Sequence, residues 1–368
     1  MFDKKVRTFI THAFKTCHNG QPSTKSKSKQ PTSFQVVSLN PSTFSSRNGM
    51  QILQFLKPFQ ISKLIVNTKQ EKRNDNGVNA AVWNIRTINV RRFSLLKSYI
   101  SSRKNTFVID NNPIVLELDY TKHHSTTDGT RENEDVFHFV RHNNTWTTMK
   151  TLNEENSHSK TMYSKERHPG TTGPMRQVFD KPFAIIVNDT STLSLGILLS
   201  NSHYIASKTT APIYYAHSIP NDVKNNYNLI FIGSSMVRDD IFQLNVNVKF
   251  EQNSNGSGFQ FHHCSFKQGD HAGIVFLAPT FNVQNPDQLV LIIDATDRDA
   301  LVDLFRGSYS SNQPLTRAMF TNMYPDFMIT NRDFRWKGYG GVSMSGYYNY
   351  NWEWDDTMSV QSDYCRRV

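Results

Sequence analysis

The sequence has few cysteines, no long apolar run and almost no acidic residues in its first 104 positions. Its three cysteines, Cys17, Cys264 and Cys365, are too few and too far apart for a disulfide framework or a four-cysteine zinc module. The densest apolar run, residues 289–293, has the length of a strand, whereas a membrane helix needs roughly 18 apolar residues. The sequence therefore predicts no membrane span.

Charge is divided unequally along the 368 residues, although the whole chain carries a net charge of +10. Residues 1–104 hold 19 Lys and Arg against 3 Asp and Glu, whereas the remainder is mildly acidic. Such a basic half is compatible with a polyanion-binding protein that acts through its N-terminal part. The alternative is that the two halves dock on each other with opposite charge. Because no nucleic-acid motif accompanies the charge, we do not expect nucleic acid as a partner.

Changes in composition divide the chain into five parts. Residues 1–33 are a basic arm with a low-complexity segment at 21–30, which cannot bury enough surface to fold. Residues 34–150 contain short strand-like runs with frequent turn signals, which favour a β-sandwich-like domain. Residues 151–175 form a polar linker, residues 176–335 a second domain, and residues 336–368 a tail rich in glycine and aromatic residues.

The second domain has a different pattern, because its apolar residues form continuous runs. These runs lie at residues 182–187, 229–232, 272–277 and 289–293. Continuous runs are typical of strands that are buried on both faces of a parallel sheet. Helices are expected at 192–200 and 297–305, the second with Thr296 or Asp297 as its cap. We therefore expect an open, mostly parallel α/β domain of flavodoxin or Rossmann type after the β-sandwich.

Motifs for catalysis and metal binding are incomplete. A nucleophile elbow needs Gly-x-Ser-x-Gly, but the segments 233–237 (GSSMV) and 341–345 (GVSMS) both lack the second glycine. No histidine follows His271, so a serine triad in the usual chain order has no base. His262, His263 and Cys264 are adjacent, which does not match the spacing of a zinc site. The sequence thus predicts no catalytic residue, no metal and no cofactor.

Small-ligand binding is instead expected at the loops that follow the strands, because open α/β sheets bind ligands there. The candidate residues are Asp189, Thr190, Gly233, Ser234 and Ser235. Gly233 with the two serines has the composition of an anion cradle at a helix start. The aromatic tail is a second candidate, as a platform for a peptide or a carbohydrate, unless it packs on the domain as a cap.

Sequons that accept N-linked sugars in secreted proteins occur at Asn143, Asn188 and Asn255. We expect glycosylation at Asn143 and Asn255 if the chain is secreted. Asn188 follows a buried strand and is a poor acceptor.

Several segments, taken in order, resemble a known family. They are residues 47–54 (RNGMQILQ), 83–93 (WNIRTINVRRF), 108–110 (VID), 173–183 (GPMRQVFDKPF), 228–233 (NLIFIG), 273–279 (GIVFLAP) and 325–327 (PDF). Over roughly residues 45–355 the set resembles the region that follows the catalytic domain in secreted proteins similar to prolyl-oligopeptidase-type serine peptidases. The resemblance carries over no catalytic residue, since that family's elbow lies in the hydrolase part.

The resemblance implies an accessory or binding module without its own nucleophile, whose partner is a catalytic α/β-hydrolase domain or subunit. It also implies an extracellular location, although residues 1–20 lack a secretory signal; either a part of the gene product precedes Met1, or the chain is a shorter relative. A cytoplasmic location is the alternative. The alternative functions are an active serine hydrolase or peptidase with an unrecognised site, and polyanion binding.

Overall fold

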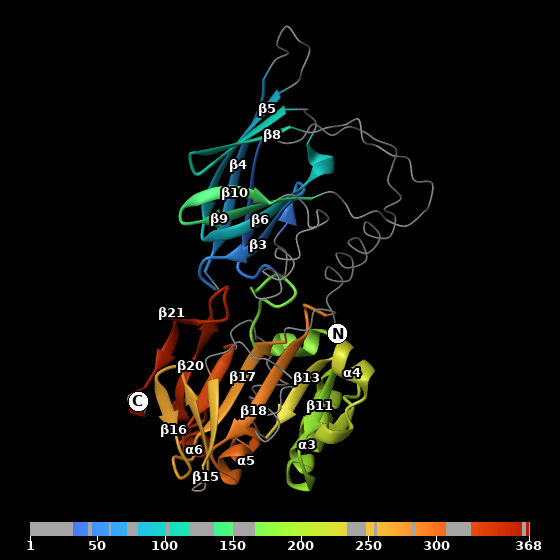
Figure 1. Cartoon of the computed structure of the whole chain (residues 1–368), viewed down its shortest axis with the longest axis vertical. Coiled ribbons are helices and arrows are strands. Elements are labelled where there is room, and N and C mark those ends of the chain that lie inside the picture. Colours follow the sequence, from blue (N-terminus) through green and yellow to red (C-terminus); the bar gives the residue numbers. More distant parts are fainter. Residues whose placement is uncertain are drawn as a thin grey trace, which may run out of the picture.

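The structure is a computed structural model that describes twelve ranges of the chain. They are residues 32–42, 46–58, 60–71, 80–100, 104–117, 136–149, 166–233, 248–253, 256–280, 285–306, 325–362 and 366–367. Figure 1 shows two domains one above the other, with the strands of the first half in the upper one and those of the second half in the lower one.

The upper domain consists of two five-stranded sheets packed face to face. The first sheet has the order β1 (Ser33–Ser38), β4 (Ser62–Glu71), β5 (Ala80–Ile88), β7 (Lys104–Ile109) and β8 (Asn112–Glu117). The second has the order β10 (Thr145–Met149), β9 (Val136–His142), β6 (Val90–Leu96), β3 (Met50–Phe55) and β2 (Ser46–Arg47). A short 3₁₀ helix, η1 (Lys97–Tyr99), follows β6.

Alternating side chains of both sheets form the core of this sandwich. In β1 every second residue is buried, as expected for a strand with one face in the core. Phe107 of the first sheet contacts Phe139 of the second, with ring centroids 5.1 Å apart. Two-residue turns at Asp110–Asn111 and Asn143–Asn144 join β7 to β8 and β9 to β10, and all four turn residues have positive φ.

The lower domain is built on an eight-stranded sheet. Its order is β12 (Ile213–Tyr215), β11 (Phe183–Val187), β13 (Asn228–Ile232), β18 (Leu289–Ala295), β17 (Gly273–Pro279), β19 (Phe327–Thr330), β20 (Val342–Tyr348) and β21 (Trp354–Gln361). The strands from β12 to β18 are parallel, and every pairing from β18 to β21 is antiparallel.

The prediction of an open, mostly parallel α/β domain is therefore wrong. All four apolar runs do form strands, but β17 runs antiparallel to both of its neighbours while every one of its residues is buried. A continuous apolar run indicates that a strand is buried on both faces of a sheet. It does not indicate strand direction, because antiparallel strands can be buried on both faces as well. The predicted tail also contributes β20 and β21, which extend the sheet further in the antiparallel sense.

Helices cover parts of this sheet, as the sequence predicted for two segments. Helix α3 (Thr190–Ser207) packs on β11 at Gly196, where an added Cβ would lie 2.9 Å from Val187. Helix α5 (Arg298–Arg306) begins after Asp297, whose carboxylate accepts a hydrogen bond from the backbone N–H of Ala300. The remaining short helices are η3 (Met175–Asp180), η4 (Ala216–Ser218), α4 (Asn221–Asn226), α6 (Phe334–Lys337) and η6 (Gly338–Gly341).

A four-stranded sheet packs against the large one and shares its hydrophobic core. It consists of β14 (Val248–Asn253), β15 (Gly256–Phe261), β16 (Cys264–Phe266) and β22 (Arg366–Arg367). Phe261 of this sheet contacts Phe327 of β19, with ring centroids 4.7 Å apart. Cys264 is disulfide-bonded, and the other two cysteines of the chain lie outside the described residues. In the described part of the chain, no helix combines the length and apolar character needed to cross a membrane.

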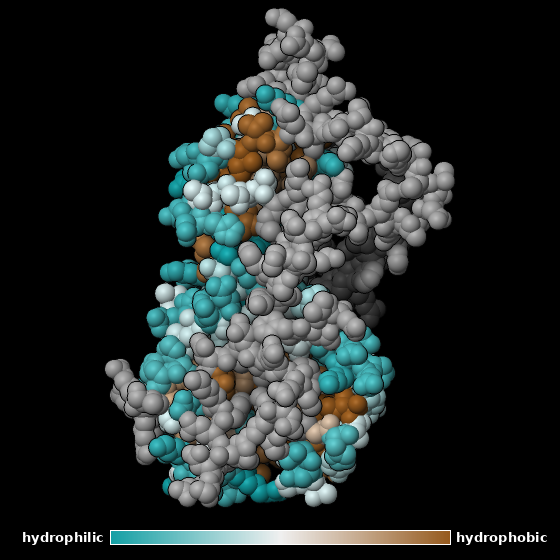
Figure 2. All heavy atoms as spheres, viewed as in Figure 1, coloured by the Kyte–Doolittle hydropathy of each residue, from teal (hydrophilic) through white to brown (hydrophobic). Residues whose placement is uncertain are grey.

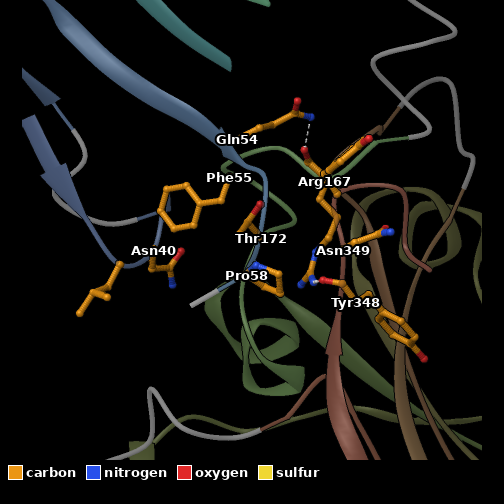
Figure 3. Close-up of a pocket in the computed structure, with 10 residues that line it drawn as sticks. Asn40, Gln54, Phe55, Pro58, Arg167, Thr172, Tyr348 and Asn349 are labelled. Carbon is orange, nitrogen blue, oxygen red and sulfur yellow. Dashed lines mark hydrogen bonds between the residues drawn. The ribbon is translucent and has the colours of Figure 1, made fainter. Parts of the chain in front are cut away.

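A polar junction joins the two domains, and Figure 2 shows mainly hydrophilic residues at this waist. Glu166 forms ion pairs of 3.0 and 3.1 Å with Arg91 and Arg92 of the sandwich. Gln54 of β3 donates a hydrogen bond to the backbone oxygen of Arg167, and both residues line a small cavity at this boundary (Figure 3). The cavity measures about 20 Å³, which is room for one water molecule. Residues 166–174, placed in a linker by composition, are thus tied to both domains.

Candidate functional site

The carboxyl ends of the parallel strands lie along one edge of the eight-stranded sheet, and the predicted ligand residues lie there as well. The backbone N–H of Gly233, directly after β13, donates to the oxygen of Ile293 in β18. A Cβ on Gly233 would lie 3.3 Å from Thr192 of α3, so the loops after β11 and β13 meet. Ser234 and Ser235 lie outside the described residues.

Asp189 and Thr190 mark the start of α3 at this edge. The Asp189 carboxylate accepts hydrogen bonds from the Ser191 hydroxyl at 2.6 Å and from the Thr192 N–H at 2.8 Å. These hydrogen bonds lower the pKa of Asp189. The carboxylate therefore occupies the position that a bound anion would take at this helix start. The ligand site expected at Asp189, Thr190 and Gly233 stays a prediction.

A polar cavity of about 340 Å³ lies further along the same edge, beyond β18. We call it the Ser343 cavity. It is bounded by the turn between β16 and β17, the end of β19 and the start of β20. Its lining consists of Ser265, Phe266, Gly269, Asp270, Ala272, Thr330, Asn331, Arg332, Asp333 and Ser343. Its volume lies within the range of small-molecule sites in proteins.

Ser343 owes its position to an irregularity in β20. Ile329 of β19 pairs with Met344, but the next residue, Thr330, pairs with Val342, so Ser343 is the extra residue of a β-bulge. Its side chain is only 2% exposed, and its hydroxyl has no hydrogen-bond partner among the described residues. Buried hydroxyl groups are normally hydrogen-bonded, because an unmade bond costs about 1–3 kcal/mol. The hydroxyl oxygen is enclosed, so a ligand or water in the cavity could hydrogen-bond to it only after a change of the Ser343 rotamer.

Several other polar groups of the cavity are already partly engaged. The Asn331 side-chain oxygen accepts from the Asp333 N–H at 2.9 Å. Asp333 also pairs with Lys337 at 2.8 Å, and Asp270 accepts from the Lys267 N–H at 2.8 Å. These contacts fix the shape of the two turns that bound the cavity. Because the Asn331 side-chain oxygen is held by the Asp333 N–H, the orientation of the Asn331 amide N–H₂ is fixed as well.

The ionisable side chains that line this cavity are those of Asp270, Arg332 and Asp333, and none of the described lining residues is a histidine. His271 lies in the neighbouring turn, where it contacts Asp297 at 3.3 Å and Asp303 at 2.9 Å. These contacts hold α5 against the start of β17. Within the described part of the chain, no three His, Cys, Asp or Glu side chains gather as metal ligands would.

The basic character of the N-terminal half is visible on the outer face of the first sandwich sheet. Lys63, Lys69 and Arg86 alternate with buried residues and form no ion pair with a described residue. They flank a shallow groove of about 310 Å³ in which the acid Asp110 is already hydrogen-bonded to Thr87. The groove is lined by Ile65, Asn67, Asn84, Ile85, Arg86, Val108, Asp110 and Asn111.

The aromatic tail is largely a part of the core. Trp352 and Tyr348 are 1% and 2% exposed, and Tyr350 lies beneath the Arg91 guanidinium at 3.8 Å. Trp336 and Tyr339 are exposed, at 78% and 56%. A stacking platform would thus be restricted to these two rings, whereas the others have the packing role of a cap.

The predicted sugar acceptors have separate outcomes. Asn143 is exposed at the tip of the β9–β10 hairpin, where a modifying enzyme could reach it, and Asn255 lies outside the described residues.

Sequence reasoning did not identify Thr330, Arg332 or Ser343 as ligand residues. The segment 341–345 has part of the pattern of a nucleophile elbow, but residues 342–345 belong to a strand rather than to a strand-to-helix turn. No local pattern marks the cavity, because its three walls come from residues about 265–272, 330–333 and 343, which meet only in the folded sheet.

Comparison with known proteins does not place the chain in a family: neither a protein-family model nor a curated protein matches the sequence.

Proposed function

We propose that the protein is a two-domain binding module that holds a small polar ligand in the Ser343 cavity. The observation that carries this proposal is the buried, unpartnered hydroxyl of Ser343 at a β-bulge in the wall of a polar cavity of about 340 Å³. β-Bulges are frequent beside binding sites because they redirect a side chain that regular pairing would turn elsewhere.

The position of the cavity supports the same proposal. It opens at the sheet edge where the parallel strands end and β17 reverses direction, and segments far apart in the chain meet there. Glu166, which pairs with Arg91 and Arg92 of the sandwich, connects the two domains at their boundary.

The experiment is a binding screen by ligand-observed NMR with neutral monosaccharides, sugar acids and dipeptides. We expect at least one class to bind the wild type and to bind Ser343→Ala at least about fivefold more weakly, the loss of one hydrogen bond. Ser345→Ala is the matched control, because Ser345 lies on the same strand and does not line the cavity. Equal loss in both variants, or binding unaffected by Ser343→Ala, would refute the proposal.

The alternative is an active serine hydrolase, which the same protein preparation can test. A serine-directed covalent probe should leave the chain unlabelled if binding is its function. Stoichiometric labelling of Ser235 or Ser343, located by mass spectrometry, would establish the alternative instead.

The accessory role beside a catalytic α/β-hydrolase domain or subunit rests on the resemblance alone. The extracellular location has further support, since the disulfide at Cys264 would persist in an oxidising compartment and Asn143 is an exposed sequon. Detection of the Cys264 disulfide and of glycan on Asn143 in protein from its source cells would test that location; a free Cys264 thiol and an unmodified Asn143 would argue for the cytoplasm.

A further inference from the structure

We infer that the shallow groove on the outer face of the first sandwich sheet binds an acidic segment of a protein partner. This inference does not depend on the proposed function, because it concerns the other domain. The groove crosses the middle strands of the sheet and measures about 310 Å³. Its lining includes Ile65 and Asn67 of β4, Asn84 and Arg86 of β5, and Val108 of β7. We call it the basic groove.

The register of the sheet arranges these side chains in two rows that run across the strands. Ile65 pairs with Arg86 in one row. Asn67 pairs with Asn84 in the next row, which continues to Val108 of the parallel strand β7. Side chains two residues apart on a strand share a face, and the residues between them are buried in the sandwich. The basic groove therefore combines amide groups, apolar side chains and a cation on one face.

Lysines lie on both sides of the basic groove. Lys63 lies on β4 two residues before the part of the strand that lines the groove, and Lys69 lies two residues after it. Both lysines therefore point to the outer face, with the groove between them. Lys63, Lys69 and Arg86 form no ion pair with a described acid. Three cations are thus available to a partner that lies in the groove.

The acid in the described lining, Asp110, is turned toward the inside of the sandwich. Its carboxylate accepts hydrogen bonds from the N–H and the hydroxyl of Thr87 at 2.7 and 2.5 Å. It also accepts from the indole N–H of Trp146 at 3.1 Å, and Trp146 is only 4% exposed. The outer face therefore presents mainly positive charge, which is complementary to an acidic partner.

Exposed apolar side chains continue this face beyond the basic groove. Val37 pairs with Lys63, which pairs in turn with Ile88, and Val115 lies on β8. Val37, Ile88 and Val115 are 48%, 42% and 54% exposed, although the solvated face of an antiparallel sheet usually carries polar side chains. A partner that carries only charge would leave these groups in water. A polypeptide with both acidic and apolar side chains would cover them together with the cations.

The amides in the groove are suited to a polypeptide backbone. Asn67 and Asn84 form no side-chain hydrogen bond with a described residue. Each amide can donate to a peptide carbonyl and accept from a peptide N–H. Single-stranded nucleic acids, by contrast, are bound largely through aromatic stacking, and no described side chain on this face is aromatic. The composition of the face therefore favours an acidic polypeptide.

The experiment compares four probes by biolayer interferometry on the full chain at about 50 mM salt. The probes are a copolymer of glutamate and tyrosine, polyglutamate, heparin and phosphatidylserine vesicles. We expect the copolymer to bind about tenfold more tightly than polyglutamate or heparin at equal concentration of negative charge, because it also covers apolar surface.

Two pairs of substitutions separate charge from apolar contact. Lys63→Gln with Lys69→Gln should weaken copolymer binding about tenfold, whereas Lys208→Gln with Lys224→Gln removes the same charge from the other domain and should leave it unchanged. Val37→Thr with Ile88→Thr should weaken the copolymer about threefold and leave polyglutamate unaffected.

Three results would overturn the inference. Binding of polyglutamate or heparin as tight as that of the copolymer, with no effect of Val37→Thr and Ile88→Thr, would mean that the face recognises charge alone. Tightest binding of the vesicles would assign the face to a lipid surface. Absence of copolymer binding, or equal weakening by the two lysine pairs, would show that the basic groove does not bind acidic polypeptides.

Discussion

Arg167 and Asp326 form a bidentate ion pair that is buried beside the boundary between the two domains. The two guanidinium nitrogens lie 2.5 and 3.1 Å from the two carboxylate oxygens, and the side chains are 4% and 0% exposed. The preceding residue, Glu166, binds the sandwich through Arg91 and Arg92. Two adjacent residues thus anchor the connecting segment in opposite directions, one to each domain.

Removing one partner of the buried pair should strongly destabilise the protein. Burial raises the pKa of Asp326, while Arg167 and the Tyr348 N–H act in the opposite direction and favour the ionised carboxyl. Asp326→Asn leaves the Arg167 charge buried without an anion, and we expect a loss of about 3–5 kcal/mol in the free energy of unfolding. Urea denaturation measures it. The exposed pair gives the control: Lys337→Gln should cost less than about 0.5 kcal/mol. A loss below about 1 kcal/mol for Asp326→Asn would contradict this interpretation.

Removing Glu166 should loosen the sandwich from the large sheet. Glu166→Gln withdraws the anion shared by Arg91 and Arg92, both of which are at least nine-tenths buried. We expect faster amide hydrogen exchange in β6 and in residues 166–174, with unchanged exchange in β13 and β18, because only the junction loses its contacts. Exchange that is unaltered in β6, or raised equally throughout both domains, would show that Glu166 does not hold the junction.

Stability should fall as the pH decreases below about 6.5, in part because of His168. Burial lowers the pKa of His168, and its Nδ1 accepts the Gly170 N–H, which requires that nitrogen to be unprotonated. The unfolded state therefore binds more protons than the folded state as the pH falls through the ordinary histidine pKa, and unfolding becomes easier. Burial also lowers the pKa of His138, which acts in the same direction.

The measurement is the urea midpoint at pH 7.5 and pH 5.5. His168→Asn keeps an acceptor for Gly170 but cannot titrate, so its midpoint should change less with pH than that of the wild type. An equal change in the two proteins would mean that His168 does not contribute.

Ser343→Ala should stabilise the unliganded protein, in contrast to most substitutions of buried residues. The hydroxyl has no partner among the described residues, and its removal relieves an unmade hydrogen bond. We expect a gain of about 1 kcal/mol by urea denaturation. Ser343→Ala would then raise stability and weaken ligand binding together. A loss of more than about 1 kcal/mol would show that the hydroxyl is hydrogen-bonded in solution, for example through a held water.

The outer face of the first sandwich sheet tests the hypothesis of polyanion binding. If this face binds polyanions, heparin affinity should fall steeply between about 50 and 200 mM salt, because bound counterions are released. Lys63→Gln with Arg86→Gln should weaken binding and reduce the salt dependence. Lys57→Gln with Lys224→Gln removes the same charge elsewhere and is the control. Equal heparin affinity at both salt concentrations would refute the hypothesis.

The sequence determined where the strands and turns lie. The apolar runs at 182–187, 229–232, 272–277 and 289–293 became β11, β13, β17 and β18, because a run of that length is buried in almost any fold that contains it. Asp297 was identifiable as a helix cap, and frequent turns were identifiable in the first domain, because capping and turn geometry depend on adjacent residues.

Strand direction and the Ser343 cavity were decided by the tertiary structure. β17 pairs with β18 on one side and with β19 on the other. Because β19 lies about 50 residues further along the chain, no local sequence pattern predicts that pairing. Ser343 became unpartnered because β20 pairs with β19 through a bulge, a feature of two strands in register and of neither strand alone. Local chemistry thus fixed the elements, whereas long-range pairing fixed their order, their directions and the cavity at their edge.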